Sequence, residues 1–577
     1  MMKKNIALLF FVSLILTLGI LFPFSAHISH AVPNVIDPLF YAWNLSYNAD
    51  NMFKGMGSAV NTNIFYPLTN TIAYSDTLWG QSIIINPVIW LTHNPILAEN
   101  LLIILSFPLS AICMYALAFY LSQNPVASFI SGIFYAFSYP RLSQIGHLPM
   151  IMSQWLPLYI LYVLKFLKNG NRKDVILACA LYLLAIASSI YFGVFLIPIT
   201  ALIVIIDTVR KIYRKNLSEY IQRIISILPV VIPFLVLLTI VLFPYLRLKV
   251  EHPELKRTIE DLRYLRAALN DYISVLPTSL LAFLSFPQKI NEHVLYPTLT
   301  ILMLAIIGVV TAIKRNKYHI GVFVLIISVS FILSLGDEQS LSIGSFSTGT
   351  VRLPYYYLYS HFPIFQIIRV PARFGIFIVL SLSALAALGI DTITKKIQIK
   401  SVLLLCLIPF LLEVWQIKTP SVSVPLENSI PAVYKWIRRQ PEPVIIAELP
   451  LSVFYHGIVM EDQLYTPYAA LRQPDTYALE TYRTYFSAYH KKRMINGYSG
   501  YLTDSYNKLA ANLEGFPSDN SIQTLQHLGV TNIIVHLWQY DVKKQDEIRT
   551  ALSESRLVTP VYFENNDVLY IISNNLD

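Results

Sequence analysis

The sequence predicts a polytopic α-helical membrane protein that ends in a soluble α/β domain. Of its 577 residues, 55% are hydrophobic and 13% are charged, which is about half the charged fraction of an ordinary soluble protein. So little charge cannot cover a water-exposed surface of this size. Apolar runs of membrane-spanning length fill the chain up to about residue 416, and shorter strand and helix patterns follow from 417.

About eleven apolar runs are candidate membrane spans. They lie near 6–26, 97–121, 126–140, 149–168, 175–189, 190–209, 224–246, 294–313, 319–336, 373–391 and 400–416. Crossing a bilayer takes roughly 20 apolar residues, so 126–140 and 175–189 are short, which is tolerated where neighbouring protein surrounds a helix. The stretch 175–209 is too long for one helix, and we expect the polar and β-branched step at Ser188–Tyr191 to divide it.

The first apolar run has two interpretations. Ser29-His30-Ala31 resembles a cleavage site, which would make the run a signal peptide. The run is longer than the apolar core of most signal peptides, however, and a retained first helix fits it better. The segment 82–92 is apolar but too short to span, and we expect it to be interfacial or re-entrant.

Positive charge in four short loops predicts the orientation. Their basic residues are Lys165, Lys168, Arg172 and Lys173; Arg210, Lys211, Arg214, Lys215 and Arg223; Lys314, Arg315 and Lys317; and Lys395, Lys396 and Lys400. With eleven spans, all four loops share one side with Lys3 and Lys4, and the positive-inside rule makes that side cytoplasmic. The net charge of +9 is therefore orientation charge in a cell-membrane protein, not a nucleic-acid-binding face.

This topology predicts two domains. Residues 1–416 form the transmembrane domain, with large outer segments at 27–96, 247–293 and 337–372, and residues 417–577 form an extracytoplasmic α/β domain. In that domain we expect strands at 444–449 and 530–536, a helix at 521–528 and a hairpin formed by 561–563 and 568–572.

Several chemistries are disfavoured by the sequence. No Walker A loop, nucleotide-binding glycine fingerprint or zinc-ligand spacing is present, which argues against an ATP-driven pump. The three cysteines, Cys113, Cys179 and Cys406, lie in apolar runs and are expected to be buried thiols.

Two carboxylates in the first outer segment are the candidate catalytic residues. Asp37 directly follows the first span, at the level where a general base can meet a lipid-borne substrate. The alternative is a helix N-cap, because Pro38 suits the first helical position. Asp76 is a second acid in the same segment, and a solvated loop carboxylate is its alternative.

Basic residues expected on the same face are candidate substrate ligands. Arg369 and Arg373 lie on either side of a proline where the chain enters the bilayer. A charged side chain is costly at that position, so we expect each arginine to have a partner, such as the phosphate of a lipid carrier. Snorkelling to phospholipid headgroups is the alternative. The remaining candidates are Arg141, His147 and Arg263, although a lone interfacial histidine is more often structural.

Six short segments occur in a fixed order along the chain: Asp37-Pro38-Leu39, Asn63-Ile64-Phe65-Tyr66-Pro67, Ala73-Tyr74-Ser75-Asp76, Gln144-Ile145-Gly146-His147, Arg369-Val370-Pro371-Ala372-Arg373-Phe374 and Asn496-Gly497-Tyr498-Ser499-Gly500-Tyr501. Together they resemble a group of prokaryotic multispan proteins of the GT-C glycosyltransferase superfamily. The resemblance covers nearly the whole chain.

The resemblance implies an inverting glycosyltransferase. GT-C enzymes place an acid in the first outer loop and take sugar from a polyprenyl-phosphate carrier, so Asp37 matches that acid and Asp76 is a weaker second. The adjacent acidic pair of some GT-C families is absent, because Pro38 follows Asp37. Whether the enzyme uses a divalent cation therefore stays open. The acceptor would be a glycan, lipid or protein. The alternative functions are a lipid or polysaccharide transporter or flippase without transferase activity, and a polymerase or ligase of lipid-linked glycans.

Overall fold

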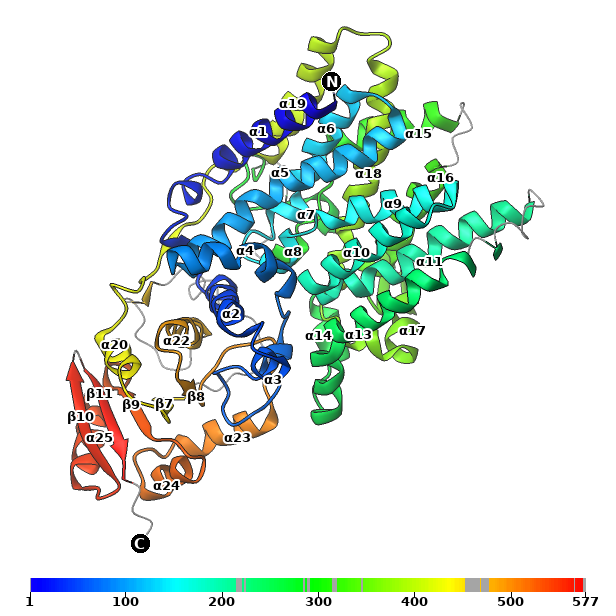
Figure 1. Ribbon diagram of the computed structural model, residues 1–577. Helices are drawn as coiled ribbons and strands as arrows, with labels where there is room; N and C mark the ends of the chain where they lie inside the picture. The colour runs from blue at the N-terminus through cyan, green and yellow to red at the C-terminus, as the bar shows by residue number, and fades with distance from the viewer. Residues whose placement is uncertain are drawn as a thin grey trace. The chain divides into compact units, whose positions relative to one another are not determined.

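The computed structural model describes residues 2–573 apart from 214–220, 223–224, 284–285, 288–290, 314–318, 344–345, 452–466, 469–476 and 565. The chain divides into two compact units, each assembled from separate segments (Figure 1). The first unit contains Met1–Ala26, Leu102–Leu242 and Lys256–Thr419. The second unit contains His27–Leu101, Phe243–Leu255 and Pro420–Asp577.

The first unit is a bundle of apolar helices. Within the described residues, six helical segments are long and apolar enough to cross a membrane: Lys3–Ile20, Pro95–Ser122, Leu148–Asn169, Ile190–Tyr213, Leu228–Glu251 and Pro371–Ile393. Shorter apolar helices run over Pro125–Ala136, Leu299–Thr311 and His319–Ser334. This hydropathy identifies a membrane protein.

Each of the predicted spans contains helix over most of its length, although residue 224 of the span 224–246 lies outside the described residues. The helices concerned are α1 (Met2–Ile20), α5 (Pro95–Ser122), α6 (Pro125–Ala136), α9 (Trp155–Asn169), α10 (Arg172–Ser188), α11 (Ile190–Tyr213), α13 (Leu228–Glu251), α15 (Leu299–Ile313), α16 (His319–Ser334), α18 (Gly375–Ile393) and α19 (Ile399–Val414). The expected division of 175–209 is confirmed, because α10 ends at Ser188 and α11 begins at Ile190. Six of these segments have full spanning length, so the count of eleven spans stays a prediction.

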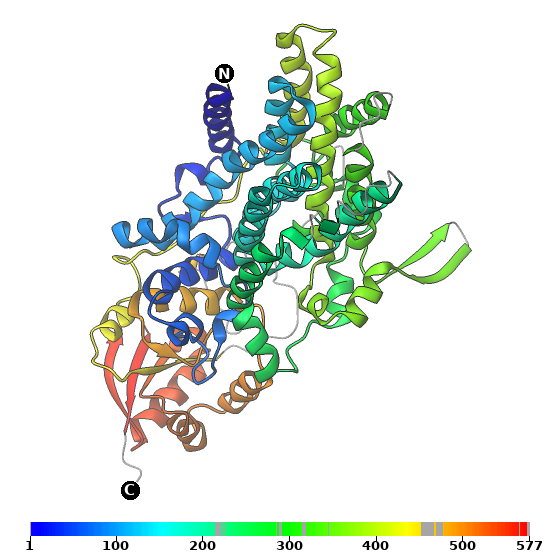
Figure 2. The ribbon, with the colours of Figure 1, turned by 45° about the vertical axis from the view of Figure 1, so that its right-hand side comes forward.

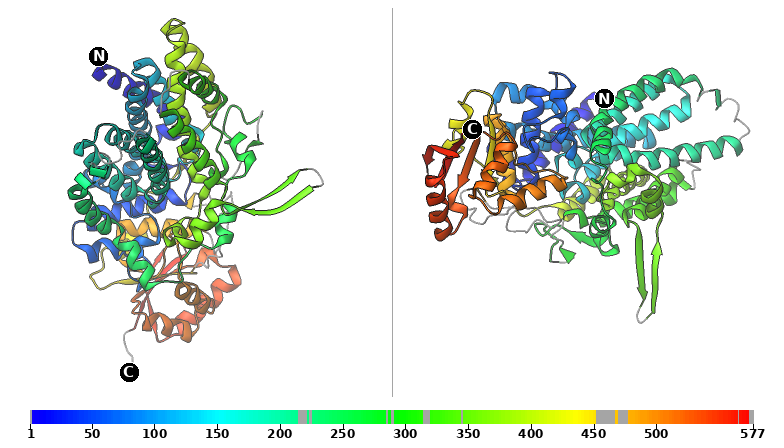
Figure 3. Two further views of the ribbon diagram at one scale, coloured as in Figure 1. Left: turned by 90° about the vertical axis from the view of Figure 1, so that its right-hand side faces the viewer. Right: turned by 90° about the horizontal axis from the view of Figure 1, so that it is seen from below.

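Two glycines bring α15 and α18 into backbone contact. A Cβ atom at Gly308 would lie 2.0 Å from the Leu385 carbonyl oxygen, and one at Gly389 would lie 2.1 Å from that of Leu304. Small residues at such crossings let membrane helices approach closely enough for dense packing. The β4–β5 hairpin (Glu338–Ile343 and Phe346–Arg352) extends away from these helices (Figures 2 and 3).

The second unit is built around a five-stranded sheet with the order β10-β11-β9-β7-β8. The strands are β7 (Ile445–Leu449), β8 (Arg493–Met494), β9 (Asn532–His536), β10 (Val558–Glu564) and β11 (Asp567–Ile572). β8, β7 and β9 are parallel, whereas β11 is antiparallel to both β9 and β10. The predicted strands and hairpin are present, as is the predicted helix, α24 (Asp519–His527).

The first loop region belongs to this second unit, which differs from the domain boundaries expected from the sequence. Backbone hydrogen bonds join 63–66 to 494–496, and β1 (Ala31–Val32) pairs with β6 (Val422–Ser423). Helix α2 (Asp37–Asn51) packs against α22 (Tyr477–His490). Strand pairing and helix packing between distant segments of the chain leave no hydropathy signal, so the sequence pattern could not reveal this grouping.

Candidate functional site

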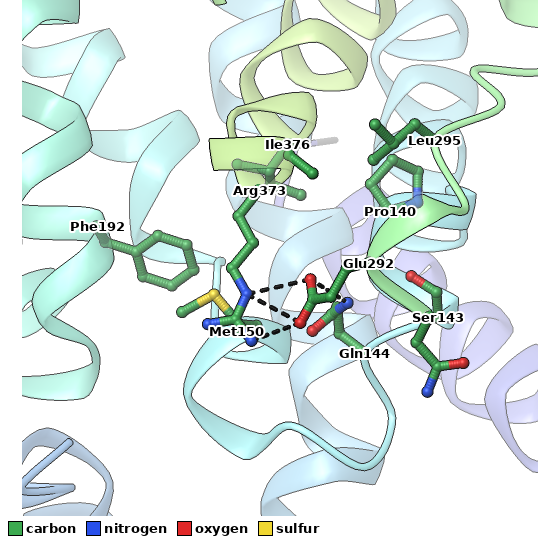
Figure 4. Close-up of a pocket in the computed structure, with 11 residues that line it drawn as sticks. Pro140, Ser143, Gln144, Met150, Phe192, Glu292, Leu295, Arg373 and Ile376 are labelled. Carbon is green, nitrogen blue, oxygen red and sulfur yellow. Dashed lines mark hydrogen bonds and ion pairs between the residues drawn. The ribbon is translucent and has the colours of Figure 1, made fainter. Parts of the chain in front are cut away.

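Arg373 and Glu292 form a buried ion pair in the first unit (Figure 4). We call these two residues, together with Arg369 and His147, the basic cluster. Glu292 is in a short 3₁₀ turn, Asn291–His293, and Arg373 is in another, Pro371–Phe374, directly before α18. The Arg373 Nη2 atom lies 2.6 Å from the Glu292 Oε1 atom, and the Arg373 Nε atom donates to both carboxylate oxygens at 3.2 Å. The Gln144 amide donates to the same carboxylate at 3.2 Å.

The charges around Glu292 keep it ionised. Burial alone would raise the pKa of its carboxyl, but Arg373, with smaller contributions from His147 and Arg369, lowers that pKa to about 2. One carboxylate therefore faces two guanidinium groups and an imidazole. The cluster has a surplus of positive charge, which suits an anionic ligand.

The two arginines of the predicted pair differ in how they are engaged. The Arg373 side chain is 8% exposed, is held by Glu292, and has its guanidinium carbon 4.6 Å from the centre of the Tyr191 ring. Arg369 is half-buried, and within the described residues its guanidinium makes no hydrogen bond or ion pair. Its backbone N–H donates to the Tyr191 hydroxyl at 3.2 Å. Arg373 is thus held in an ion pair with Glu292, whereas the Arg369 side chain is the less engaged of the two among the described residues.

A small cavity of about 20 Å³ adjoins the ion pair. Its lining includes Gln144, Met150, Phe192, Glu292 and Arg373. A space of this size holds roughly one water molecule, so it cannot admit a sugar ring.

Arg141 lies inside the helix bundle rather than on an open face. It is fully buried, and its three side-chain nitrogens all donate to the protein. The acceptors are the carbonyl oxygens of Ser106, Ala136 and Ile151 and the hydroxyls of Ser106 and Ser153. Burial lowers the pKa of Arg141 to about 10. These bonds engage the guanidinium of Arg141 inside the bundle, and the substrate contact expected from the sequence stays a prediction.

Arg263 is likewise engaged by acids of its own unit. Its guanidinium lies 3.1 Å from Asp337 and 2.8 Å from Glu338, at the start of β4, and its side chain is 41% exposed. Arg266 contacts the same Asp337 carboxylate at 3.1 Å. These ion pairs hold the start of the β4–β5 hairpin. A guanidinium engaged in this way does not favour a substrate role for Arg263.

Asp37 begins α2 in the second unit. It is the first residue of the helix, and Ile36, which has no capping side chain, occupies the N-cap position. The Tyr498 hydroxyl donates to the Asp37 Oδ1 atom at 3.2 Å. Two segments that carry the GT-C resemblance, one from the first loop and one from the tail, therefore meet at this carboxylate.

A further carboxyl, Glu99, is close enough to interact electrostatically with Asp37. Glu99 is fully buried, and neither of its carboxyl oxygens has a hydrogen-bond partner among the described residues. The sequence analysis missed it because Glu99 lies inside an apolar run. Asp76 is half-buried, its backbone carbonyl accepts from Asn44 at 3.1 Å, and its side chain interacts electrostatically with Tyr245.

No group of three or more histidine, cysteine or acidic side chains that could hold a metal ion occurs among the described residues. The possible divalent cation therefore stays a prediction.

Three solved structures are similar to this chain to different degrees. The arabinofuranosyltransferase AftD from Mycobacteria matches 99% of the chain with a TM-score of 0.55 and 12% identity, and the match covers 40% of the AftD chain. The apo oligosaccharyltransferase of Archaeoglobus fulgidus matches 92% of the chain with a TM-score of 0.44 and 10% identity, and the match covers 69% of the oligosaccharyltransferase chain. The Archaeoglobus fulgidus oligosaccharyltransferase AglB, in complex with an inhibitory peptide and a dolichol-phosphate, matches 99% of the chain with a TM-score of 0.42 and 10% identity. That match covers 74% of the AglB chain.

The AftD match shows that this chain shares the fold of that arabinofuranosyltransferase, in agreement with the GT-C resemblance noted in the sequence. The chain itself belongs to the family described as Domain of unknown function (DUF6311), whose model matches residues 7–415. No curated protein matches the chain significantly. The chain spans less than half the length of AftD.

Proposed function

We propose that the protein is a glycosyltransferase that transfers a sugar from a polyprenyl-phosphate-linked donor to an extracytoplasmic acceptor, with inversion. The observation that carries this proposal is the half-buried Arg369 beside the Arg373–Glu292 pair, directly before the apolar helix α18. The Arg369 guanidinium makes no hydrogen bond or ion pair with the residues that the structure describes. Placed just before an apolar helix, it fits the phosphate of a lipid carrier.

An apolar groove in the first unit supports a lipid donor. It has a volume of about 190 Å³ and is lined by residues of α15, α16 and α18, namely Leu302, Ala305, Ile306, Val309, Val310, Val324, Ile327, Leu382 and Leu385. Leu382 follows Arg373 by nine residues, or about 14 Å along a helix. A carrier held by its phosphate near Arg369 could therefore place its hydrocarbon chain against these side chains.

Asp37 supplies the chemistry of the proposed reaction. Its carboxylate takes the proton of an acceptor hydroxyl while that oxygen attacks the anomeric carbon of the donor sugar. The bond from that carbon to the phosphate oxygen breaks, and the lipid phosphate leaves with the electron pair, stabilised by guanidinium charge. A single displacement of this kind inverts the anomeric centre.

A transporter is the weaker alternative. Transporters place their functional charges within spans and near discontinuous helices. Here Asp37 begins α2, Arg373 lies in the 3₁₀ turn directly before α18, and Arg369 lies just before that turn, so all three are outside the apolar cores of the helices. The GT-C fold also favours the transferase.

The donor site is tested by substituting Arg369. We expect Arg369→Ala to weaken binding of undecaprenyl phosphate about 10- to 100-fold, because a charge-assisted hydrogen bond contributes roughly 1.5–3 kcal/mol. Arg369→Lys keeps the charge but loses the planar fork, so it should recover only part of the affinity. Native mass spectrometry of the detergent-solubilised protein measures the binding.

Arg352→Ala is the matched control, since its guanidinium carbon lies 4.4 Å from the centre of the Tyr356 ring in the same unit. Unchanged binding in the control and reduced binding in both Arg369 variants would support the proposal. Equal binding by Arg369→Ala and the natural protein would refute it.

The proposed reaction also requires the N-terminus to be cytoplasmic and the C-terminal segment to be extracytoplasmic. A cysteine replacing the exposed Val542 should react with an impermeant thiol reagent in intact cells. A cysteine replacing the exposed Lys396, in a predicted cytoplasmic loop, should react only after the membrane is permeabilised. The reverse labelling pattern would contradict this orientation.

A further inference from the structure

The C-terminal segment reaches Asp37 through one side chain. The Tyr498 hydroxyl donates to the Asp37 Oδ1 atom at 3.2 Å, although 461 positions separate the two residues in the sequence. A tyrosine hydroxyl is a neutral donor, and its acceptor here is the carboxylate that the proposed reaction uses as general base. A hydrogen bond of this kind restricts the orientation of a carboxylate and favours its ionised form.

Contacts with two helices hold Tyr498 in place. Its ring meets the Phe40 ring of α2 edge to face, with 5.8 Å between the ring centres, and the Tyr477 ring at the start of α22, with 6.3 Å between the ring centres. Its backbone N–H donates to the Thr484 Oγ1 atom of α22 at 3.0 Å. The hydroxyl is therefore aimed at Asp37 by a side chain that has little freedom to turn away.

The two residues before Tyr498 are fixed to the sheet and to the first loop region. The Asn496 side chain accepts from the Glu448 N–H at 2.8 Å and donates to the Glu448 carbonyl at 2.9 Å. The Asn496 carbonyl accepts from the Phe65 N–H at 3.0 Å. A Cβ atom at Gly497 would lie 2.9 Å from the Phe65 ring, so a larger residue there would displace the segment that carries Tyr498.

A second carboxyl group acts on Asp37 as well. Glu99 of α5 interacts electrostatically with Asp37, and two neighbouring carboxyl groups favour a proton on one of them. The Tyr498 hydroxyl biases that choice, because its donation stabilises negative charge on Asp37. Asp37 is therefore the member of the pair that is equipped to stay ionised and to accept a proton.

We propose that Tyr498 is a positioning residue for the general base, and that its hydroxyl orients the Asp37 carboxylate and keeps it ionised until it takes the proton of the acceptor hydroxyl. This inference rests on the proposed function, in which Asp37 is the base. Tyr498 acts through Asp37 and not on the substrate. The C-terminal segment is then part of the catalytic site, because one of its side chains sets the state of an acid in the first loop region.

Tyr498→Phe tests the proposal, because it removes the hydroxyl and keeps the ring. Initial rates of sugar transfer are measured by mass spectrometry over a series of pH values, in membranes from cells that make each variant in place of the natural protein. We expect the maximal rate to fall about 10-fold, since the lost hydrogen bond is one to a charged group. The pH of half-maximal transfer on the acid side should rise by about one unit, because the ionised carboxylate has lost a donor.

Tyr562→Phe is the matched control. The Tyr562 hydroxyl also donates to a carboxylate of the second unit, that of Glu564 on β10, and we expect its loss to change neither the rate nor the pH profile. The position of the acid limb does not depend on how much of the protein is folded. A lower yield of the Tyr498→Phe protein therefore cannot imitate the shift.

A Tyr498→Phe profile with the same acid limb as that of the natural protein would overturn the proposal, even at a lower rate, because a purely structural role predicts that result. Asp37→Asn separates this failure from a failure of the proposed function. If Asp37→Asn loses transfer while Tyr498→Phe behaves like Tyr562→Phe, only the positioning role is wrong. If Asp37→Asn transfers sugar at the natural rate, the assignment of the base is wrong, and the role of Tyr498 falls with it.

Discussion

Replacing Asp37 by asparagine should lower the rate of sugar transfer by a factor of about 10²–10⁴, which is the usual effect of losing a general base. The amide has nearly the size of the carboxylate but cannot accept the proton of an attacking hydroxyl. Its Oδ1 atom can still accept the Tyr498 hydroxyl, so the contact seen at 3.2 Å is kept. Mass spectrometry of surface glycans, in cells whose own copy of the gene is deleted, measures the transfer.

A matched variant on the same helix controls for effects on folding. Asp50, near the other end of α2, pairs with Lys491 at 2.6 Å, and its side chain is 35% exposed. Asp50→Asn removes one negative charge from the same helix, and we expect near-normal transfer because exposed ion pairs contribute little to stability. Near-normal transfer by Asp37→Asn, at equal protein level, would contradict the assignment of Asp37 as the base.

The elements of the fold were predictable wherever a periodic apolar pattern determines them. The break between α10 and α11 follows from the polar step at Ser188 and Ser189, and the sheet strands β7 and β9 follow from short apolar runs. Such patterns depend on neighbouring residues, so one sequence suffices to find them. The grouping of 27–101 with the C-terminal segment depends on contacts between residues hundreds of positions apart, and no local pattern reports those.

The candidate site was predictable in its residue types but not in its pairings. The cost of placing Arg373 at a membrane boundary predicted a partner. Nothing in the sequence distinguished Glu292 from the other acids of 247–293 as that partner. Arg141 was assigned to a substrate site because of its position between spans, whereas backbone carbonyls satisfy its guanidinium inside the bundle. Hydrogen bonds between residues far apart in the sequence determine both the partner of Arg373 and the surroundings of Arg141.

The second unit contains a fully buried network of charged groups that the sequence pattern did not reveal. Arg483 on α22 forms an ion pair with Glu480, and its Nε atom lies 3.5 Å from the Glu448 carboxylate on β7. The same carboxylate accepts from Tyr434 at 2.7 Å and lies 3.0 Å from the His536 Nε2 atom. Burial opposes ionisation of Glu448, but His536 and Arg483 outweigh it and hold the pKa of that carboxyl below its usual value.

Replacing Arg483 by methionine should lower the free energy of unfolding of the second unit by about 3–5 kcal/mol, the usual cost of removing one partner from a buried ion pair. Methionine fills similar space but leaves Glu448 and Glu480, both 0% exposed, without the guanidinium charge. Pulse proteolysis in denaturant, with the protein in detergent micelles, measures the stability. Arg549→Met is the control, because that half-buried guanidinium contacts Phe563 at the surface and should change stability by about 0.5 kcal/mol or less.

The cause of this loss can be separated from a loss of packing. If the uncompensated charge is responsible, adding Glu448→Gln and Glu480→Gln to Arg483→Met should restore much of the stability, because neutral amides cost less to bury than lone carboxylates. If methionine simply packs badly against α22 and β7, the two glutamines should add to the damage. Recovery in the triple variant would therefore assign the network a charge-balancing role in the core, and further loss would exclude it.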